Sequence, residues 1–226
     1  MKNVVITGTS RGIGFELAQL FAKNDFNVLA LSRNSNTLEA INHKNITTLP
    51  VDLTDEKSLE LVSEFVKNNW KQVDILIHNA GTLLNKEFSQ TSTEDFINVY
   101  QVNVFAVASL TQCLLPFFVE NTHTVTISSM GGVQGSMKFA GLAAYSSSKG
   151  AVITLSELLA EEYRDQGYKF NVLAIGAVQT EMLAEAFPDY QAPLHPLEMA
   201  QYIFDFANTG AKFYNGKVLQ VSSTTP

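Results

Sequence analysis

The sequence predicts an α/β protein built on a doubly wound parallel sheet of about seven strands, with helices on both faces. Short apolar segments rich in β-branched residues alternate with segments apolar at helical spacing along the whole 226-residue chain. Most strand segments are apolar on both faces, as in a parallel sheet that is covered by helices. Right-handed crossovers then restrict the strand order to the doubly wound arrangement.

The composition suits one soluble domain. Hydrophobic residues make up 46% of the chain and charged residues 16%, which allows a sizeable core to be buried. The N-terminal apolar run is too short for a signal peptide, and no apolar run approaches the ~20 residues of a membrane helix. We therefore expect residues 1–226 to form a single cytoplasmic domain with no membrane partner.

Charge and rare residue types exclude several classes of function. Acidic residues outnumber basic ones by 22 to 15, and the net charge of −7 would repel a phosphate backbone, so we expect no nucleic-acid partner. A single cysteine, Cys113, cannot form an internal disulfide. The four histidines are scattered without metal-ligand spacing, so we expect no metal site.

The first half of the chain opens with strands and short helices. The β-branched run 3–8 ends in glycine and predicts a buried strand, and the apolar spacing of 13–24 predicts a helix. Residues 26–32 predict the second strand, 36–44 a short helix and 46–52 the third strand.

Longer helices follow in the middle of the chain. Thr54-Asp55 is a cap signal for a helix that runs to about Asn69. Residues 73–81 predict the fourth strand, 93–119 a long helix and 123–129 the fifth strand.

The last third of the chain completes the sheet. Residues 142–166 predict a helix and 169–175 the sixth strand. A loop at 181–195 contains apolar residues that could cover an apolar substrate or simply exclude water. A helix at 196–207 and a strand at 217–221 follow.

A glycine-rich turn, TGTSRGIG, connects the first predicted strand to the first helix. Gly8, Gly12 and Gly14 would let the backbone approach a ligand closely, and the helix N-terminus would present unpaired N–H groups to an anion such as a pyrophosphate. The alternative is a tight turn that binds nothing. In a doubly wound sheet this turn lies at the ligand-binding edge, which favours the first interpretation.

A tyrosine and a lysine stand four residues apart on the helix predicted at 142–166. Tyr145 and Lys149 therefore project from the same face. A nearby ammonium favours phenolate and would lower the pKa of the tyrosine, which makes the pair a candidate general acid or base. The alternative is a packed tyrosine and a solvated lysine.

Seven motifs in order resemble the short-chain dehydrogenase/reductase family over nearly the whole chain: TGTSRGIG, VDLTD, HNAG, QVNVFA, ISS, YSSSK and IGAVQT. The resemblance implies a Rossmann-type oxidoreductase with a nicotinamide cofactor. It also implies a homodimer or homotetramer, in which the helices at 93–119 and 142–166 pair across a two-fold axis. Phe96, Phe105, Leu155 and Leu159 are candidate contacts there, and each could equally belong to the core.

The resemblance assigns four catalytic residues. Tyr145 would be the general acid, Lys149 would hold the nicotinamide ribose, and Asn103 would anchor a water relay behind the lysine. Ser129 would orient the substrate carbonyl, with Ser128 as the competing assignment, although strand alternation points Ser128 the other way. Fifteen residues separate Ser129 from Tyr145, and this loop resembles that of a subgroup of NADPH-dependent carbonyl reductases.

The second strand ends in Ser32-Arg33, where enzymes that prefer NAD usually have an acid for the ribose 2′-hydroxyl. Arg33 and Arg11 suit a 2′-phosphate, so we expect NADP(H); the alternative is that both are solubilising surface charges.

Asp52 would bond the adenine amine, with Leu53 beside it. Ile175-Gly176 departs from the Pro-Gly of the family. The full expected cofactor-binding set is Gly8, Ser10, Arg11, Gly12, Ile13, Gly14, Arg33, Asp52, Leu53, Asn79, Ala80, Gly81, Tyr145, Lys149, Gly176, Val178 and Thr180.

The motifs together predict an NADPH-dependent oxidoreductase that reduces a ketone or aldehyde to an alcohol. The alternative of a different class is a non-catalytic NADP(H)-binding regulator on the same fold. Such a regulator would have no need of Asn103, Ser129, Tyr145 and Lys149 together. The oxidative direction on an alcohol uses the same residues, and the sequence does not separate the two directions.

Overall fold

A computed structural model describes residues 1–222 of the chain, and within them the sheet has seven strands, all parallel. The strand order is β3-β2-β1-β4-β5-β6-β7. The expected doubly wound sheet is therefore confirmed. The strands are β1 (Asn3–Thr7), β2 (Asn27–Ser32), β3 (Ile46–Pro50), β4 (Val73–His78), β5 (Phe118–Ser129), β6 (Lys169–Ile175) and β7 (Lys217–Val221).

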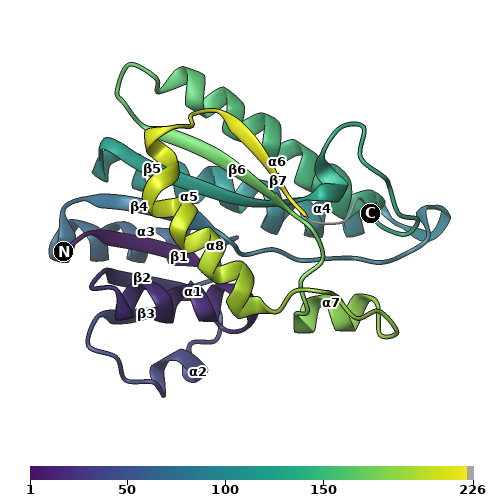
Figure 1. Ribbon diagram of the computed structural model, residues 1–226, viewed down its shortest axis with the longest axis horizontal. Coiled ribbons are helices and arrows are strands. Elements are labelled where there is room, and N and C mark those ends of the chain that lie inside the picture. The colour runs from purple at the N-terminus through teal and green to yellow at the C-terminus, as the bar shows by residue number, and fades with distance from the viewer. Residues whose placement is uncertain (223–226) are drawn as a thin grey trace.

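Helices cover both faces of this sheet, and each face has its own core. Helices α1 (Gly12–Lys23) and α8 (Pro196–Thr209) pack on one face, where Phe21 makes edge-to-face contacts with Phe26 and Phe204. The other face carries α3 (Glu56–Phe65), α5 (Ala106–Leu114) and α6 (Ala143–Glu162). Figure 1 shows α8 crossing the sheet on the viewer's side, with α5 behind it. All five residues of β1 are buried, as a central strand between two helical layers requires.

The long helical stretch between β4 and β5 is divided into several parts. Helix α4 (Thr93–Tyr100) begins with a capping box between Ser92 and Asp95, and a π-helical turn, η3 (Gln101–Phe105), separates it from α5. By length and composition the stretch Thr93–Phe117 could cross a membrane, a test that core helices also pass. The side chains of Leu110 and Leu114 are fully buried in the core between α5 and the sheet.

Several element boundaries differ from the sequence expectations. Residues 118–119 belong to β5 rather than to the preceding helix, which ends in a 3₁₀ turn containing Pro116, a residue without an N–H to continue it. Helix α2 (Asn36–Glu39) is shorter than predicted, and Asn42 follows it with a positive φ of 50°. A short helix, α7 (Glu181–Ala186), occupies part of the predicted loop.

The two halves of the sheet diverge at the carboxyl ends of β1 and β4. The chain leaves β1 toward β2 on one side, whereas β4 lies on the other side of β1. Ligands of doubly wound sheets bind in the crevice that this change of direction opens. The loops after β1, β4, β5 and β6 all reach this edge.

Candidate functional site

The turn after β1 requires glycine at three positions for two different reasons. Gly8 and Gly12 have positive φ values of 72° and 60°, a conformation that other residues rarely adopt. A Cβ at Gly14 would lie 2.2 Å from the carbonyl oxygen of Gly8, so this glycine lets α1 approach the end of β1. Ile13 between them is buried in the core and anchors the helix.

The N-terminus of α1 opens toward this turn. Arg11 is the N-cap residue in an extended conformation, its side chain makes no cap hydrogen bond, and the first turn contains no acidic residue. The first N–H groups of a helix carry a partial positive charge and lack intrahelical acceptors. The turn can therefore hold an anion at the carboxyl edge of the sheet.

Thr7 and Asn79 join the ends of β1 and β4. The hydroxyl of Thr7 accepts from the backbone N–H groups of Asn79 and Ala80 at 3.0 and 2.9 Å. The side-chain amide of Asn79 donates to the carbonyl groups of Thr7 and Gly8 at 3.0 and 3.2 Å. These bonds fix the floor of the crevice. Thr7 was not among the residues predicted from the sequence, although it is the last residue of β1 and directly precedes Gly8.

Asn103 lies in the π-helical turn and is almost fully buried. Its Oδ1 accepts from the Thr82 N–H at 2.8 Å, and its Nδ2 donates to the Thr82 carbonyl and to Ser148 Oγ at 2.9 Å each. Ser148 in turn donates to the Tyr145 carbonyl at 2.7 Å. Asn103 therefore connects the loop after β4 to the helix that carries Tyr145 and Lys149.

Gly81 brings the same two elements into close contact. A Cβ at Gly81 would lie 3.3 Å from Asn103 Oδ1 and 3.4 Å from Lys149 Nζ. Such contacts are tight, and a side chain would push the lysine ammonium away. The glycine of the NAG sequence thus lies directly against the predicted catalytic residues.

The two serines at the end of β5 point in opposite directions, as alternation along a strand requires. Ser128 is buried and donates to the carbonyl of Lys149 at 2.8 Å, which is a bond within the fold. Ser129 is partly exposed, and its hydroxyl lies near enough to that of Tyr145 to act against the rise in the pKa of the phenol. It also accepts from the Gly131 N–H at 3.2 Å. Of the two candidates, Ser129 is the one beside the tyrosine.

Tyr145 and Lys149 project from α6 toward the same place, but they do not interact as expected. Lys149 Nζ donates to the Ile127 carbonyl at 2.9 Å and lies 5.9 Å from the centre of the Tyr145 ring. The pKa of Tyr145 is raised because the phenol is desolvated, and the nearby Ser129 hydroxyl only partly opposes this rise. Burial also lowers the pKa of Lys149 to about 8. The expected lowering of the tyrosine pKa by the ammonium is therefore wrong for this structure.

The two arginines expected at one phosphate have different partners. The pKa of Asp52 is lowered mainly by hydrogen bonds from Thr54, and the charge of Arg33 contributes to the same shift. Arg33 at the end of β2 therefore lies near Asp52, which follows β3. Arg11 instead forms an ion pair with Glu185 of α7, with Nη1 and Oε1 2.7 Å apart. Glu185 was not among the residues that the sequence singled out.

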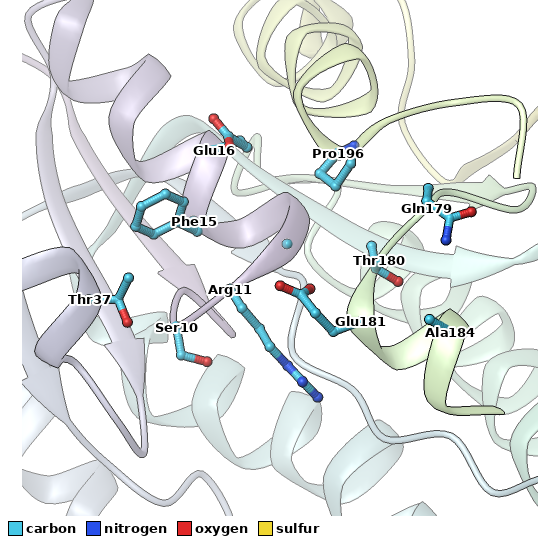
Figure 2. Close-up of a pocket in the computed structure, with 11 residues that line it drawn as sticks. Ser10, Arg11, Phe15, Glu16, Thr37, Gln179, Thr180, Glu181, Ala184 and Pro196 are labelled. Atoms are coloured by element: carbon cyan, nitrogen blue, oxygen red, sulfur yellow. The ribbon is translucent and has the colours of Figure 1, made fainter. Parts of the chain in front are cut away.

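A cavity of about 590 Å³ lies between the glycine turn and α7 (Figure 2). Ser10, Arg11 and Gly12 line one side of it, and Thr180 and Glu181 line the other. Thr180 caps α7 by accepting from the Leu183 N–H at 3.2 Å.

The loop after β6 is held close to the end of β7. The Gly176 N–H donates to the Val221 carbonyl at 2.9 Å, and a Cβ at Gly176 would lie 2.5 Å from Ser222 Oγ. Val178 is buried, and Leu53 packs against the core beside β3. Within residues 1–222 no cluster of three or more His, Cys, Asp or Glu side chains could hold a metal ion.

Known proteins resemble this chain over most of its length. The sequence model of the family described as short chain dehydrogenase matches residues 2–191. The 3-oxoacyl-(acyl-carrier-protein) reductase FabG of Escherichia coli strain K12 is 28% identical, with 98% of this chain and 96% of FabG covered.

Solved structures match the fold as well. The structure of ElxO with NADP bound is 30% identical with a TM-score of 0.85, and the match covers 98% of this chain and 97% of ElxO. A 3-ketoacyl-(acyl-carrier-protein) reductase from Brucella melitensis, complexed with NADH, has a TM-score of 0.90 at 24% identity over 99% and 98% of the two chains. At that identity the second match shows the fold alone.

Proposed function

The chain belongs to the short-chain dehydrogenase family, and on that premise we propose that it is an NADPH-dependent oxidoreductase that reduces a ketone or aldehyde to an alcohol. The observation that carries the proposal is that Ser129, Tyr145 and Lys149 come together at the carboxyl edge of the sheet, with Lys149 Nζ 5.9 Å from the centre of the Tyr145 ring and the Ser129 hydroxyl near the phenol. Residues 1–226 would act as one domain, although 223–226 lie outside the described part of the chain.

The residues at the crevice fit a dinucleotide. Gly8 and Gly12 adopt positive φ, and the uncapped start of α1 offers N–H groups to a pyrophosphate. Gly14 lets α1 approach the end of β1, and Gly81 lets the loop after β4 lie against Asn103 and Lys149. Asp52 and the NAG backbone would line the adenosine and the middle of the cofactor, and Thr180 its carboxamide end.

The end of β2 supports the choice of NADP(H). Arg33 is exposed there, and the strand ends in Ser32, whose hydroxyl donates to the Asn34 carbonyl at 2.8 Å. No carboxylate occupies the position of Ser32 to repel a 2′-phosphate. That ElxO, at 30% identity, has been solved with NADP bound supports the same choice.

When bound, NADPH supplies the hydride that reduces the carbonyl carbon. Ser129 donates a hydrogen bond to the carbonyl oxygen and holds it beside the Tyr145 hydroxyl. Because burial raises the pKa of Tyr145, the phenol stays protonated at neutral pH and can give its proton to the oxygen as negative charge develops. The Ile127 carbonyl holds the Lys149 ammonium near the Tyr145 ring, where its charge would favour the phenolate that forms.

Asn103 and Ser148 are positioning residues in this scheme. Together they fix the backbone at Thr82 and the turn of α6 that starts at Tyr145. The side chains of Asn103 and Ser148 bond to each other and to backbone groups, and not to the Tyr145 hydroxyl. Their part is to keep Lys149 and the NAG backbone in register.

A non-catalytic NADP(H)-binding regulator is the competing proposal. It would need the glycine turn and Arg33 but neither Ser129 beside Tyr145 nor the buried Lys149. The test is a panel of ketones and aldehydes with NADPH, followed by the loss of nicotinamide absorbance. Turnover of at least one carbonyl supports the enzyme, whereas NADPH binding without turnover of any member supports the regulator.

The proposal extends to assembly and location. Ile97, Phe105 and Leu158 are exposed apolar residues on the long helical stretch and on α6, which suits a homodimer or homotetramer built on that face. Of the contacts expected from sequence, Phe105 is exposed, whereas Leu159 packs against the core. We propose a cytoplasmic oligomer.

A further inference from the structure

Helix α7 is held by side-chain contacts at its C-terminal end rather than by a core. None of its six residues is buried. Glu185 pairs with Arg11, and the carbonyl of the next residue, Ala186, accepts from Asn85 Nδ2 at 2.9 Å. Elements with few buried contacts open at little cost in free energy. Helix α7 can therefore be released by breaking a small number of surface contacts.

The base of this segment is closed more firmly than its tip. Val178 bridges Leu194, and the Gln179 N–H donates to the Leu194 carbonyl at 2.8 Å. The side chain of Gln179 also accepts from the Ala192 N–H at 2.7 Å. The segment between these points forms an arm, with α7 inside it, that returns to the body of the protein at a fixed place.

Arg11 is the contact that joins the arm to the glycine turn. Its Nη1 and Nη2 donate to Glu185 Oε1 and Oε2 at 2.7 and 3.4 Å, a two-pronged pair between exposed side chains. The Glu185 hydrogen bond and the charges of Glu185 and Glu181 raise the pKa of Arg11. The same guanidinium belongs to the turn where a cofactor phosphate is expected.

The cavity beside Arg11 extends in two directions. Thr37 of α2 lines one part of it, and Thr180 and Ala184 line the part next to α7. Figure 2 shows the Arg11 side chain between Ser10 and Glu181. A guanidinium can form a bidentate pair with only one anion at a time. Arg11 lies where it could bind either the Glu185 carboxylate of α7 or an anion near β2.

We propose that Glu185 competes with the 2′-phosphate of NADP(H) for Arg11, so that binding of the phosphate loosens the C-terminal end of α7, where the contact from Asn85 to the Ala186 carbonyl remains. The inference rests on the proposed function, because it takes NADP(H) as the cofactor. Coupling between two binding equilibria is reciprocal. Glu185 therefore weakens binding of the phosphate by the same factor by which the phosphate weakens the Arg11–Glu185 pair. Because the pair is exposed, that factor is roughly two- to fivefold.

The first test measures dissociation constants of NADPH and NADH by fluorescence. Glu185→Gln should bind NADPH about two- to fivefold more tightly than the wild-type protein and leave NADH unchanged. In an Arg11→Gln background the same change should have no effect. Glu64→Gln, which removes one exposed charge on α3, is the matched control. Equal effects of Glu185→Gln and Glu64→Gln, or an effect that persists without Arg11, would overturn the proposal.

The second test follows amide hydrogen exchange in α7. Adenosine 2′,5′-bisphosphate carries the phosphate but no nicotinamide that could touch α7, and 5′-AMP is the matched probe without the 2′-phosphate. The bisphosphate should raise exchange at residues 183–187 in the wild-type protein, and 5′-AMP should not. Glu185→Gln should exchange fast with either probe. Unchanged or slower exchange at saturating bisphosphate rejects the competition.

The two proposals fail in different ways. If neither NADPH nor the bisphosphate binds the wild-type protein, the choice of cofactor is wrong and the competition is rejected with it. If NADPH binds the wild-type protein but Glu185→Gln changes nothing, the cofactor stands and only the competition is rejected.

Discussion

Replacing Asn103 by alanine should destabilise the protein strongly, although the residue lies on a helix and carries no charge. The change removes three hydrogen bonds of 2.8 to 2.9 Å that join Thr82 and Ser148 through one buried amide. It also leaves the Thr82 N–H without the acceptor that it has now.

The magnitude follows from these three bonds. Each neutral hydrogen bond contributes about 1 kcal/mol net, and an orphaned buried donor costs about 1–3 kcal/mol. We expect the free energy of unfolding to fall by about 3 kcal/mol, since the bonds share one side chain and are not independent. For a chain of this size that corresponds to a fall in Tm of about 6–12 °C.

The assay is urea unfolding of Asn103→Ala followed by circular dichroism, with Asn98→Ala as the control. Asn98 is exposed on α4, so its replacement should change the unfolding free energy by less than about 0.5 kcal/mol. The slope with urea should be the same for all three proteins, because the surface exposed on unfolding is unchanged. Equal midpoints for the two variants would show that the hydrogen bonds of Asn103 to Thr82 and Ser148 do not stabilise the fold.

Three further predictions concern the cofactor, pH and assembly. Arg33→Asp should invert the order of NADPH and NADH dissociation constants by repelling the 2′-phosphate; an unchanged order in a cofactor titration would rule this out. Burial lowers the pKa of His78 to about 3 and that of His123 to about 4, so both are neutral in the fold, whereas the unfolded chain takes up protons below about 6.5. The free energy of unfolding should therefore be highest above pH 6.5 and fall by about 1.4 kcal/mol per pH unit for each histidine as the pH drops toward 5. A urea midpoint that does not change between pH 7 and 5 would contradict this. Leu158→Glu should reduce the mass seen by light scattering at micromolar concentration, and an assembly that survives it does not use this face of α6.

Much of the fold could be predicted because its signals are local. Apolar runs and helical spacing gave the seven strands and the helices that separate most of them, and the sheet order follows from general rules of handedness. The ends of the helices and strands were harder to predict from the sequence. The start of β5 at Phe118 depends on pairing with Val73, a contact 45 residues away that no local pattern carries.

The candidate site was predictable where a motif carries it and not where a long-range contact does. The resemblance assigned Ser129 to the substrate carbonyl over Ser128, and in the fold Ser128 is turned toward the Lys149 carbonyl while Ser129 lies near Tyr145. It expected the ammonium of Lys149 to lower the tyrosine pKa, but sequence spacing shows neither the desolvation of the phenol nor the carbonyl of Ile127 that holds the ammonium. The pair of Arg11 with Glu185 spans 174 positions, so only the folded chain reveals it.

The measurement that tests the central claim most directly compares cofactor binding with turnover in Tyr145→Phe. The change removes the hydroxyl that gives the proton and keeps the ring that packs beside Lys149. On a carbonyl substrate found in the panel, turnover should fall by about 10²-fold or more, the usual share of general acid catalysis, while the NADPH dissociation constant stays near the wild-type value. Lys149→Ala should lower turnover and also weaken NADPH binding. Wild-type turnover in the phenylalanine variant would show that Tyr145 is not the proton donor and would contradict the account.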